Sequence, residues 1–121
     1  MEFMSNLKFQ YSNYNADQQP LREALLTLGN GYFATRAAFE AQKAGSNHYP
    51  GTYLGGGYNR LESEIQGKII ENEDLVNWPN WLDLTFKPES EKWLDLDDCR
   101  IHDFNHQLDL EKGVLSRYVR F

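Results

Sequence analysis

A β-hairpin pattern near the C-terminal end of the sequence constrains the fold more than any other feature. Residues Phe104 to Leu110 alternate apolar and polar side chains, and Val114 to Phe121 follow after the turn residues Glu111-Lys112-Gly113. Alternation with a period of two places one set of side chains on each face of a strand, and a glycine in the connection suits a tight reversal. The pattern predicts two antiparallel strands.

Other segments carry strand signals, and one favours a short helix. Leu21 to Leu28 follows Pro20, which is favourable in a first helical turn, and ends before Gly29; its leucines at 21, 25 and 28 share a helical face. The same segment is also compatible with a strand. Gly29-Asn30-Gly31 predicts a turn, because Asn and Gly tolerate positive φ angles. The remaining strand candidates are Leu7 to Tyr11, Tyr32 to Thr35, Trp81 to Phe86 and Trp93 to Leu96.

Composition supports a mainly β fold in one domain. Aromatic residues make up 14% of the 121 residues, with nine Gly and four Pro, and these types are enriched in strands and turns. The length corresponds to one domain on the usual scale of roughly 100–200 residues. We therefore expect residues 1–121 to form a single, mainly β domain of antiparallel strands with one or two short helical turns.

Two central segments are expected to differ in burial. Residues 44–58 are dominated by Gly, Ser, Asn, Pro and Tyr, a composition typical of a long loop. Residues 74–83 carry two tryptophans, two leucines and a valine around Pro79. This second segment is too apolar for a surface loop, and we expect it to be largely buried.

Charge and cysteine content narrow the choice of partner and compartment. The net charge is −6, which disfavours nucleic acid and anionic membrane surfaces. Cys99 is the only cysteine, so an intrachain disulfide is excluded. The N-terminus lacks a basic and apolar export signal, and no stretch approaches the ~18 apolar residues of a membrane span. These features favour a cytoplasmic protein.

Both ends of the sequence raise questions about its extent. Met4 follows Met1 so closely that residues 1–3 fit a cloning remnant as well as a natural start. Phe121 lies within a strand-like run, whereas strands of ~5–6 residues usually finish in turn residues. We expect the chain to be a truncated part of a larger protein, with an exposed sheet edge that favours self-association.

Four motifs follow one another along the sequence. They are LGNGYFATRA at residues 28–37, YPGTY at 49–53 with YNR at 58–60, EDLVNWPNWL at 73–82 and LDLEKGVLSR at 108–117. Any one of them is weak, but their order and spacing together are specific. Together they resemble the start of glycoside hydrolase family 65, the maltose, trehalose and kojibiose phosphorylase family.

The resemblance implies a fold and a place in a larger enzyme. In the family, this region forms about the first half of an N-terminal super-β-sandwich, which precedes an (α/α)6 barrel that holds the active site. The general acid is a glutamate far beyond residue 121, so no catalytic residue is expected here and this chain alone should be inactive. No metal or organic cofactor is implied. The expected partners are the barrel of the same parent chain, a disaccharide and phosphate for the parent enzyme, and a second subunit.

Three functions remain open from the sequence. The first is a non-catalytic domain of an inverting phosphorylase, which converts an α-glucosyl disaccharide and phosphate into glucose 1-phosphate and glucose. The second is the equivalent domain of a family 65 trehalase-type hydrolase. The third is a free-standing carbohydrate-binding or protein-binding module, which the Tyr and Trp content permits.

Two glycine patterns suggest phosphate binding but have the wrong context. Residues 29–34 fit G-x-G-x-x-A, yet no βαβ pattern surrounds them, and Gly51 stands about twenty residues on where a ribose-binding acid is needed. Gly55-Gly56-Gly57 lacks a following Gly-Lys-Ser/Thr. We interpret the first as a turn and the second as a flexible loop.

Spacing also raises a metal site and paired carboxylates. Cys99, His102 and His106 have a zinc-like spacing, but on a strand Cys99 and His102 face opposite sides. We expect solvated hairpin residues instead. Two acidic groups, Glu71 with Glu73 and Asp74, and Asp95 with Asp97 and Asp98, resemble glycosidase carboxylates. Charged turns give the same pattern, and we favour that interpretation.

Aromatic residues provide the remaining candidate contacts. Trp78 and Trp81 could stack on sugar, but we expect core packing beside Pro79 because a Trp buries a large apolar area. The loop tyrosines are better candidates for contact with the barrel, a second subunit or sugar, with neighbouring polar residues assisting. These candidate contact residues are Tyr49, Tyr53, Tyr58, Asn59 and Arg60.

Overall fold

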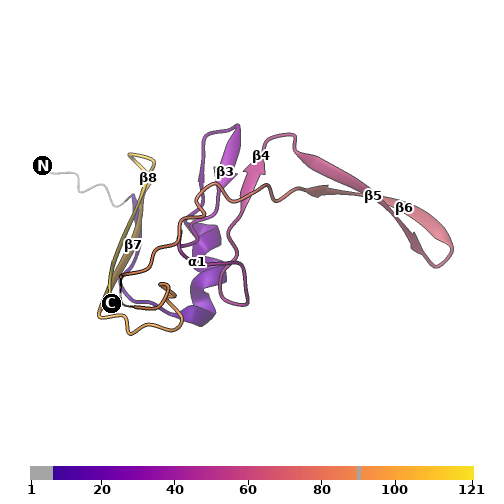
Figure 1. Ribbon diagram of the computed structural model, residues 1–121. Helices are drawn as coiled ribbons and strands as arrows, with labels where there is room; N and C mark the ends of the chain where they lie inside the picture. Colours follow the sequence, from indigo (N-terminus) through magenta and orange to yellow (C-terminus); the bar gives the residue numbers. More distant parts are fainter. Residues whose placement is uncertain (1–6, 90) are drawn as a thin grey trace, which may run out of the picture.

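The computed structural model describes residues 7–89 and 91–121, and the alternatives for residues 1–3 therefore lie outside the described residues. It is built from three small antiparallel sheets and one α-helix (Figure 1). In chain order the elements are β1 (Lys8–Tyr11), a 3-10 turn (Ala16–Gln18), α1 (Gln19–Leu25), β2 (Leu28–Gly29), β3 (Phe33–Thr35), β4 (Thr52–Leu54), β5 (Tyr58–Ile65), β6 (Lys68–Leu75), β7 (Asp103–Asp109) and β8 (Val114–Arg120). The predicted mainly β, antiparallel fold class is confirmed.

The predicted C-terminal hairpin is confirmed as strands β7 and β8, which form one sheet with β1 in the order β1-β7-β8. Phe9 of β1 pairs with Leu108 of β7, so the first and last strands of the described residues belong to one sheet. Gly113 has a φ of 63° in the hairpin turn, a conformation that costs glycine little. The sheet provides one wall of the core.

The second sheet has the order β2-β3-β4, and its first turn is the one predicted at residues 29–31. Gly31 has a φ of 87°, and Oδ1 of Asn30 accepts hydrogen bonds from the amides of Tyr32 and Phe33, both at 3.0 Å. The region predicted to be only a loop, residues 44–58, contains strand β4. With three residues, β4 is too short to produce a recognisable alternation.

Helix α1 confirms the helical alternative for residues 21–25, whereas Leu28 begins strand β2. The buried face of the helix is not the leucine face. Leu21 and Leu25 are 62% and 50% exposed, whereas Arg22 and Glu23 are buried. The polar side chains are buried because they have specific partners: Nη1 of Arg22, for example, donates to the carbonyl oxygen of Asn13 at 2.6 Å. Hydrogen bonding to partners elsewhere in the chain here outweighs the simple apolar periodicity.

The core consists of two small apolar clusters between the β1-β7-β8 sheet and the segments that face it. One contains Leu26, Ala37 and Leu108, with Leu28 and Leu115 packed at its edge. The other contains Ala41, Leu94 and Leu96, with flanking side chains that include Tyr14, Phe39, Cys99, Ile101 and Val119. Alanine contributes to both clusters, which lets the coil after β3 lie close to the sheet.

Three sequence expectations between residues 74 and 96 are wrong. Residues 81–86 and 93–96 form no strand, and the backbone–backbone bonds that involve them are isolated, such as Leu94 N to Phe86 O at 3.1 Å. Residues 74–83 are not largely buried: Trp78 and Trp81 are 43% and 63% exposed. The apolar character of residues 74–83 predicts burial, but the described residues of this chain do not cover them.

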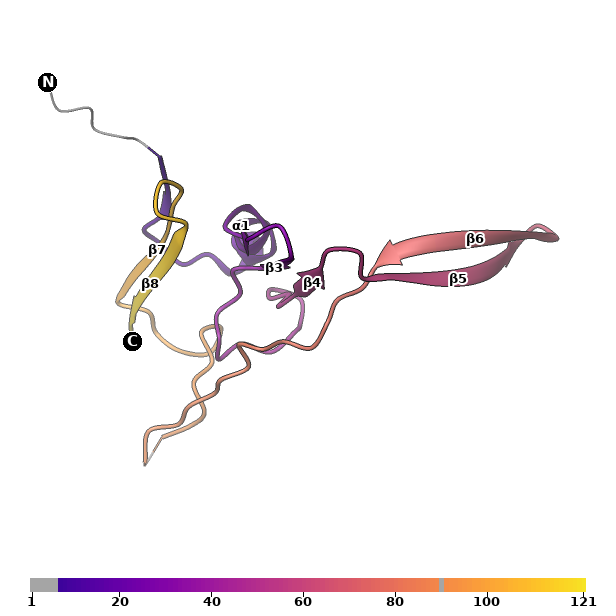
Figure 2. The same ribbon diagram turned by 90° about the horizontal axis from the view of Figure 1, so that it is seen from above.

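Strands β5 and β6 form a hairpin that projects from the rest of the molecule, as the two views at right angles show (Figures 1 and 2). We call residues 58–75 the arm. Its strands pair along eight residues each, around a turn at Gln66 and Gly67 with φ angles of 53° and 77°.

Among the described residues, no helix has the length and apolar character that crossing a membrane requires.

Candidate functional site

Four titratable side chains, Tyr14, Glu23, His48 and Asp97, form a polar cluster in which Glu23 and His48 are buried. Glu23 lies on α1 and His48 in the loop before β4; their side chains are 1% and 3% exposed, with His48 Nδ1 2.8 Å from Glu23 Oε1. The hydroxyl of Tyr14 lies 3.1 Å from His48 Nε2 and also donates to Oδ1 of Asp97. Four segments far apart in the sequence therefore meet through polar side chains.

The charges of this cluster shift the pKa values of its members. Burial alone lowers the pKa of His48, but the hydrogen bond and the negative charge of Glu23, together with Asp97, raise it above 6.5 overall. For Tyr14, burial and the bond to Asp97 raise the pKa of the phenol above its ordinary value. Burial opposes ionisation of Asp97, yet its hydrogen bonds and His48 lower the pKa of that carboxyl. The carboxylates of Glu23 and Asp97 thus stabilise the charged form of His48.

The partners of the cluster leave little capacity for chemistry on a substrate. Both ring nitrogens of His48 are occupied, and the second oxygen of Glu23 accepts the amide of Tyr49 at 2.8 Å. A pocket of about 540 Å³ beside the cluster has Tyr14 and Asp97 on its wall, and Glu23 does not line it. A histidine with no free nitrogen is a poor general base. We interpret the cluster as a structural junction.

A second buried polar group surrounds Arg117 on β8. Its guanidinium donates to the backbone oxygens of Ala37 and Ala38 at 2.9 and 3.1 Å and pairs with Glu40. His106 of β7 lies beside it, at 3.2 Å, and is 2% exposed. Burial and the nearby Arg117 charge lower the pKa of His106 to about 3. The sheet thereby holds the coil after β3 by charged hydrogen bonds as well as by apolar packing.

The residues with zinc-like spacing do not converge. The thiol of Cys99 lies 3.9 Å from the carbonyl oxygen of Leu96, His102 is exposed, and His106 is buried against Arg117. The expectation of solvated hairpin residues is therefore wrong for His106. Within residues 7–89 and 91–121, no three His, Cys, Asp or Glu side chains lie close enough to ligate one metal ion.

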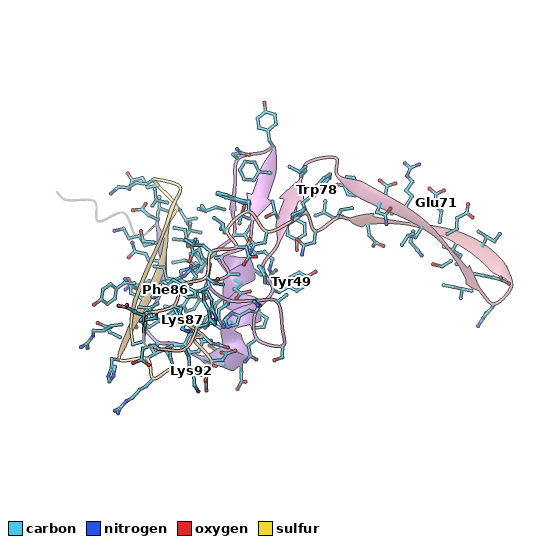
Figure 3. All side chains as sticks on the ribbon, viewed as in Figure 1. Tyr49, Glu71, Trp78, Phe86, Lys87 and Lys92 are labelled. Atoms are coloured by element: carbon cyan, nitrogen blue, oxygen red, sulfur yellow. The ribbon has the colours of Figure 1, made fainter. Side chains whose placement is uncertain are left out.

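The candidate contact residues lie on three separate elements. Tyr49 precedes β4 and is 48% exposed, Tyr53 is half-buried on β4, and Tyr58 begins β5 at 55% exposure. Asn59 and Arg60 follow on β5 and are exposed. Figure 3 shows Tyr49 pointing away from the body and Trp78 at the base of the arm. The structure thus distributes these residues over a surface and does not gather them into one pocket.

Tyr49 is held in place by a second arginine. Nε of Arg36 donates to the carbonyl oxygen of Tyr49 and Nη2 to that of Pro20, both at 2.8 Å. The guanidinium carbon lies 5.2 Å from the centre of the Tyr49 ring, within the range of a cation–π interaction. The Tyr49 side chain is consequently oriented, although it is exposed.

Most of the carboxylates singled out from the sequence are engaged in hydrogen bonds or ion pairs within the chain. Glu71 and Glu73 on β6 both face Arg60 of β5, at 3.6 and 3.0 Å from its Nε. Asp95 accepts from Nε2 of Gln42 at 3.0 Å and from the amide of Asp97 at 2.9 Å. Carboxylates that cap turns and pair across a hairpin need no catalytic explanation.

The tryptophans and glycines have defined positions. Nε1 of Trp81 donates to Oγ1 of Thr35 at 2.9 Å, and the amide of Trp78 donates to the carbonyl of Thr52 at 2.8 Å. Both rings are exposed, so the expected core packing is wrong for this chain. Residues 29–34 form the β2–β3 turn, as predicted. Gly55 to Gly57 form a hydrogen-bonded turn between β4 and β5, with Gly55 N donating to Tyr32 O at 2.7 Å.

Two residues of the polar cluster, Glu23 and His48, could not be found from the sequence. Glu23 and His48 are separated by 25 positions and belong to no recognisable motif. The one available signal was the polar face of the 21–28 helix, since Arg22 and Glu23 stand opposite the leucine stripe.

Comparison with known proteins places the chain within a large enzyme family. Residues 9–121 match the profile of glycosyl hydrolase family 65, N-terminal domain. An uncharacterized glycosyl hydrolase of Mycobacterium tuberculosis is 40% identical over 92% of this chain, which spans 8% of that protein. Kojibiose phosphorylase of Caldanaerobacter subterraneus subsp. tengcongensis is 37% identical over 92% of the chain and 13% of its own length.

A solved structure agrees with the fold. A protein from the human microbiome, provisionally assigned as a kojibiose phosphorylase, superposes with a TM-score of 0.81 at 27% identity. The superposition covers 93% of this chain and 15% of that one. The chain therefore spans a small fraction, between 8% and 15%, of the relatives it matches.

Proposed function

The chain belongs to glycosyl hydrolase family 65 as its N-terminal domain, and we propose that it is the non-catalytic N-terminal domain of an inverting disaccharide phosphorylase. The parent enzyme would convert an α-glucosyl disaccharide and phosphate into glucose 1-phosphate and glucose. In this role the 121 residues bind and position the catalytic part of the same polypeptide. By themselves they have no activity.

The match of residues 9–121 to the N-terminal domain profile is the observation that carries this proposal. Named relatives support the reaction type, because they are phosphorylases: kojibiose phosphorylase is 37% identical, and maltose phosphorylase of Bacillus subtilis is 29% identical. Trehalose 6-phosphate phosphorylase of Lactococcus lactis is 48% identical over 49% of this chain. These relatives are named for different substrates, but all are phosphorylases. They therefore support the reaction type of the parent enzyme, and its substrate is identified by the assay below.

The geometry supports a non-catalytic role. The acidic and histidine side chains that are closest together, Glu23, His48 and Asp97, are engaged with one another and with Tyr14. Inverting cleavage needs an acid that reaches the glycosidic oxygen and a nucleophile on the opposite face of the sugar. Carboxylates engaged with internal partners, of which Glu23 is also fully buried, do not meet that requirement.

The reaction proposed for the parent has a stereochemical consequence. A general acid protonates the oxygen of the glycosidic bond as it breaks, and a phosphate oxygen forms the new bond to the anomeric carbon from the other face. Phosphate replaces the activated water of an inverting hydrolase. An α-linked substrate therefore yields the β-anomer of glucose 1-phosphate.

The test is an assay of the full-length parent with kojibiose, maltose, trehalose, trehalose 6-phosphate and nigerose, each with and without phosphate. We expect phosphate-dependent release of β-glucose 1-phosphate from one of them, identified by its phosphorus and proton NMR signals. The 121-residue chain, assayed beside the parent, should release none.

Each alternative gives a different result. Glucose release without phosphate would replace the phosphorylase by a trehalase-type hydrolase. Turnover by the 121-residue chain itself would overturn its non-catalytic role. Sugar binding by this chain, with no activity in the parent, would favour a carbohydrate-binding module.

A further inference from the structure

The arm, residues 58–75, has no partner strand among the described residues: β5 and β6 pair only with each other. An isolated two-stranded hairpin is marginally stable at best in water. The arm nevertheless extends for its whole length away from the body (Figure 2). A two-stranded hairpin usually requires a further strand or another protein surface against which it packs.

The two faces of the arm differ in chemistry, as the pairing register shows. One face carries four glutamates and one arginine along its middle, with Ile69 near the tip and the Tyr58–Leu75 pair at the base. Figure 3 shows Glu71 directed outward from this part of the arm. We call it the acidic face; its charged residues are Arg60, Glu62, Glu64, Glu71 and Glu73.

The opposite face carries three apolar side chains, with the charged residues Lys68 and Asp74 near its two ends. Leu61, Ile65 and Ile70 lie on this face, because Leu61 pairs with Asn72, Ser63 with Ile70 and Ile65 with Lys68. Ile70 is therefore a diagonal neighbour of both other residues, at the ~7–8 Å spacing that long side chains bridge. We call these three residues the apolar face; they are 58%, 52% and 41% exposed, in chain order.

We propose that the apolar face of the arm is the docking surface for the part of the parent polypeptide outside these 121 residues, with the acidic face left in water. The inference rests on the proposed function, since it takes the parent to be longer than this chain. The docked surface would be apolar and uncharged at its centre, to match Leu61, Ile65 and Ile70. It would bury these side chains and leave the glutamates solvated.

The size of the face decides between the parent polypeptide and a second copy. Eight residues at ~3.4 Å each give a strand of about 27 Å, and two strands about 10 Å wide offer roughly 270 Å². Stable complexes between separate proteins bury about 800 Å² on each partner. A covalently connected segment has a high effective concentration and needs far less area. A second copy on this face alone would lack the area.

The comparison structure carries this fold within a much longer polypeptide. The superposition covers 93% of this chain but only 15% of the larger protein. The unmatched 7% of 121 residues is about eight residues, fewer than the arm contains, so at least half of the arm recurs where most of a long polypeptide is also present. That protein has ample chain to cover an apolar face of this size.

The first test uses the full-length parent with a photoreactive p-benzoylphenylalanine in place of Ile70 or, as the matched control, of Ile69. The two positions are adjacent, carry the same residue and face opposite sides; Ile69 is 73% exposed. We expect position 70 to crosslink to peptides beyond residue 121 within the same polypeptide. Position 69 should give at least fivefold less product.

Other products overturn the proposal. Crosslinked dimers from position 70, at twice the chain mass, would assign the face to a second copy. Equal products from positions 69 and 70, or none from position 70, would show that the face is not covered. The crosslinking readout does not depend on catalysis. Crosslinks in a parent that shows no phosphorolysis would contradict the proposed function only. Phosphorolysis without crosslinks would contradict the docking proposal only.

A second test compares Ile70→Lys with Ile69→Lys by hydrogen exchange in the full-length parent. A lysine at 70 places a charge against an apolar surface, so amides of the arm should exchange at least tenfold faster, whereas a lysine at 69 should change exchange less than twofold. Equal effects would contradict the proposal. Should Ile70→Lys fail to fold, Ile70→Thr retains the β-branched shape and is expected to give a smaller acceleration in the same amides.

Discussion

His48 and Glu23 form a nearly solvent-free pair, with His48 Nδ1 2.8 Å from Glu23 Oε1 and side-chain exposures of 3% and 1%. Glu23 comes from the only α-helix of the described residues, and His48 from the loop before β4. Removing one partner of such a pair leaves the other buried without compensation, at a cost of about 3–5 kcal/mol. The pair therefore joins helix α1 to the loop that leads into the second sheet, and substitution of either residue is expected to destabilise the fold.

The substitution Glu23→Gln tests this junction. It keeps the size of the side chain but removes the charge that raises the pKa of His48, so we expect that pKa to fall and the free energy of unfolding to decrease by about 2–4 kcal/mol. NMR titration of the imidazole and denaturant unfolding of the chain measure the two effects. The exposed Glu62→Gln is the control, with a change within about 0.5 kcal/mol. Equal losses in both variants would contradict a buried, paired Glu23.

The lowered pKa of His106 predicts that the folded chain loses stability in acid. Its pKa is about 3 in the folded chain because of burial and Arg117, against about 6.5 in the unfolded chain. Between these values only the unfolded chain binds the proton, so stability is complete above pH 6.5 and falls as pH decreases toward 3, by about 1.4 kcal/mol per pH unit at most. Unfolding by denaturant between pH 4 and 8 should show this slope.

The variant His106→Gln isolates the effect of His106. It cannot titrate, so its stability should fall less steeply between pH 6.5 and 4 than that of the original chain. His48 is a natural internal comparison, because its raised pKa has the opposite sign. Its contribution is present below pH 6.5 and is lost only as pH rises through the raised value. An unchanged acid slope in His106→Gln would assign acid sensitivity to other groups.

Strands next to clear turn residues could be predicted from the sequence. The β7–β8 hairpin and the β2–β3 turn were predicted correctly, because Gly113 and Gly31 hold positive φ angles that mark the reversals. Both signals are local, since the residues that set the turn are the residues in the turn. The family was also identified, from motifs that include these turns.

Features that depend on distant partners could not be predicted. Leu21 and Leu25 carry the apolar pattern of α1 yet face water, because Arg22 and Glu23 have partners elsewhere in the chain. Nothing near Glu23 in the sequence indicates His48. Trp81 was expected in the core for its apolar area, and it is 63% exposed because no described segment covers it.

Arg36→Lys is expected to loosen the segment that carries Tyr49. Arg36 donates through two nitrogens to the carbonyls of Tyr49 and Pro20, and a lysine ammonium does not reproduce this fork. We expect a loss of about 1–2 kcal/mol, from the hydrogen bonds to a charged donor, and faster hydrogen exchange at Tyr49. The exposed Arg60→Lys should cost at most about 1 kcal/mol. Equal effects would show that Arg36 does not hold this loop.

Gly57→Ala should disturb the junction between body and arm. A Cβ at Gly57 would lie 2.8 Å from Nε1 of Trp78 and 3.2 Å from the carbonyl oxygen of Leu54. Relief of these contacts requires the Trp78 ring to move, so we expect altered tryptophan emission and a loss of about 1–3 kcal/mol. Gly45→Ala is the matched control, since a Cβ there meets nothing within 4 Å. It should leave emission unchanged, and stability unchanged or slightly higher because alanine restricts the unfolded chain. An unshifted emission spectrum in Gly57→Ala would show that Trp78 does not pack on this turn.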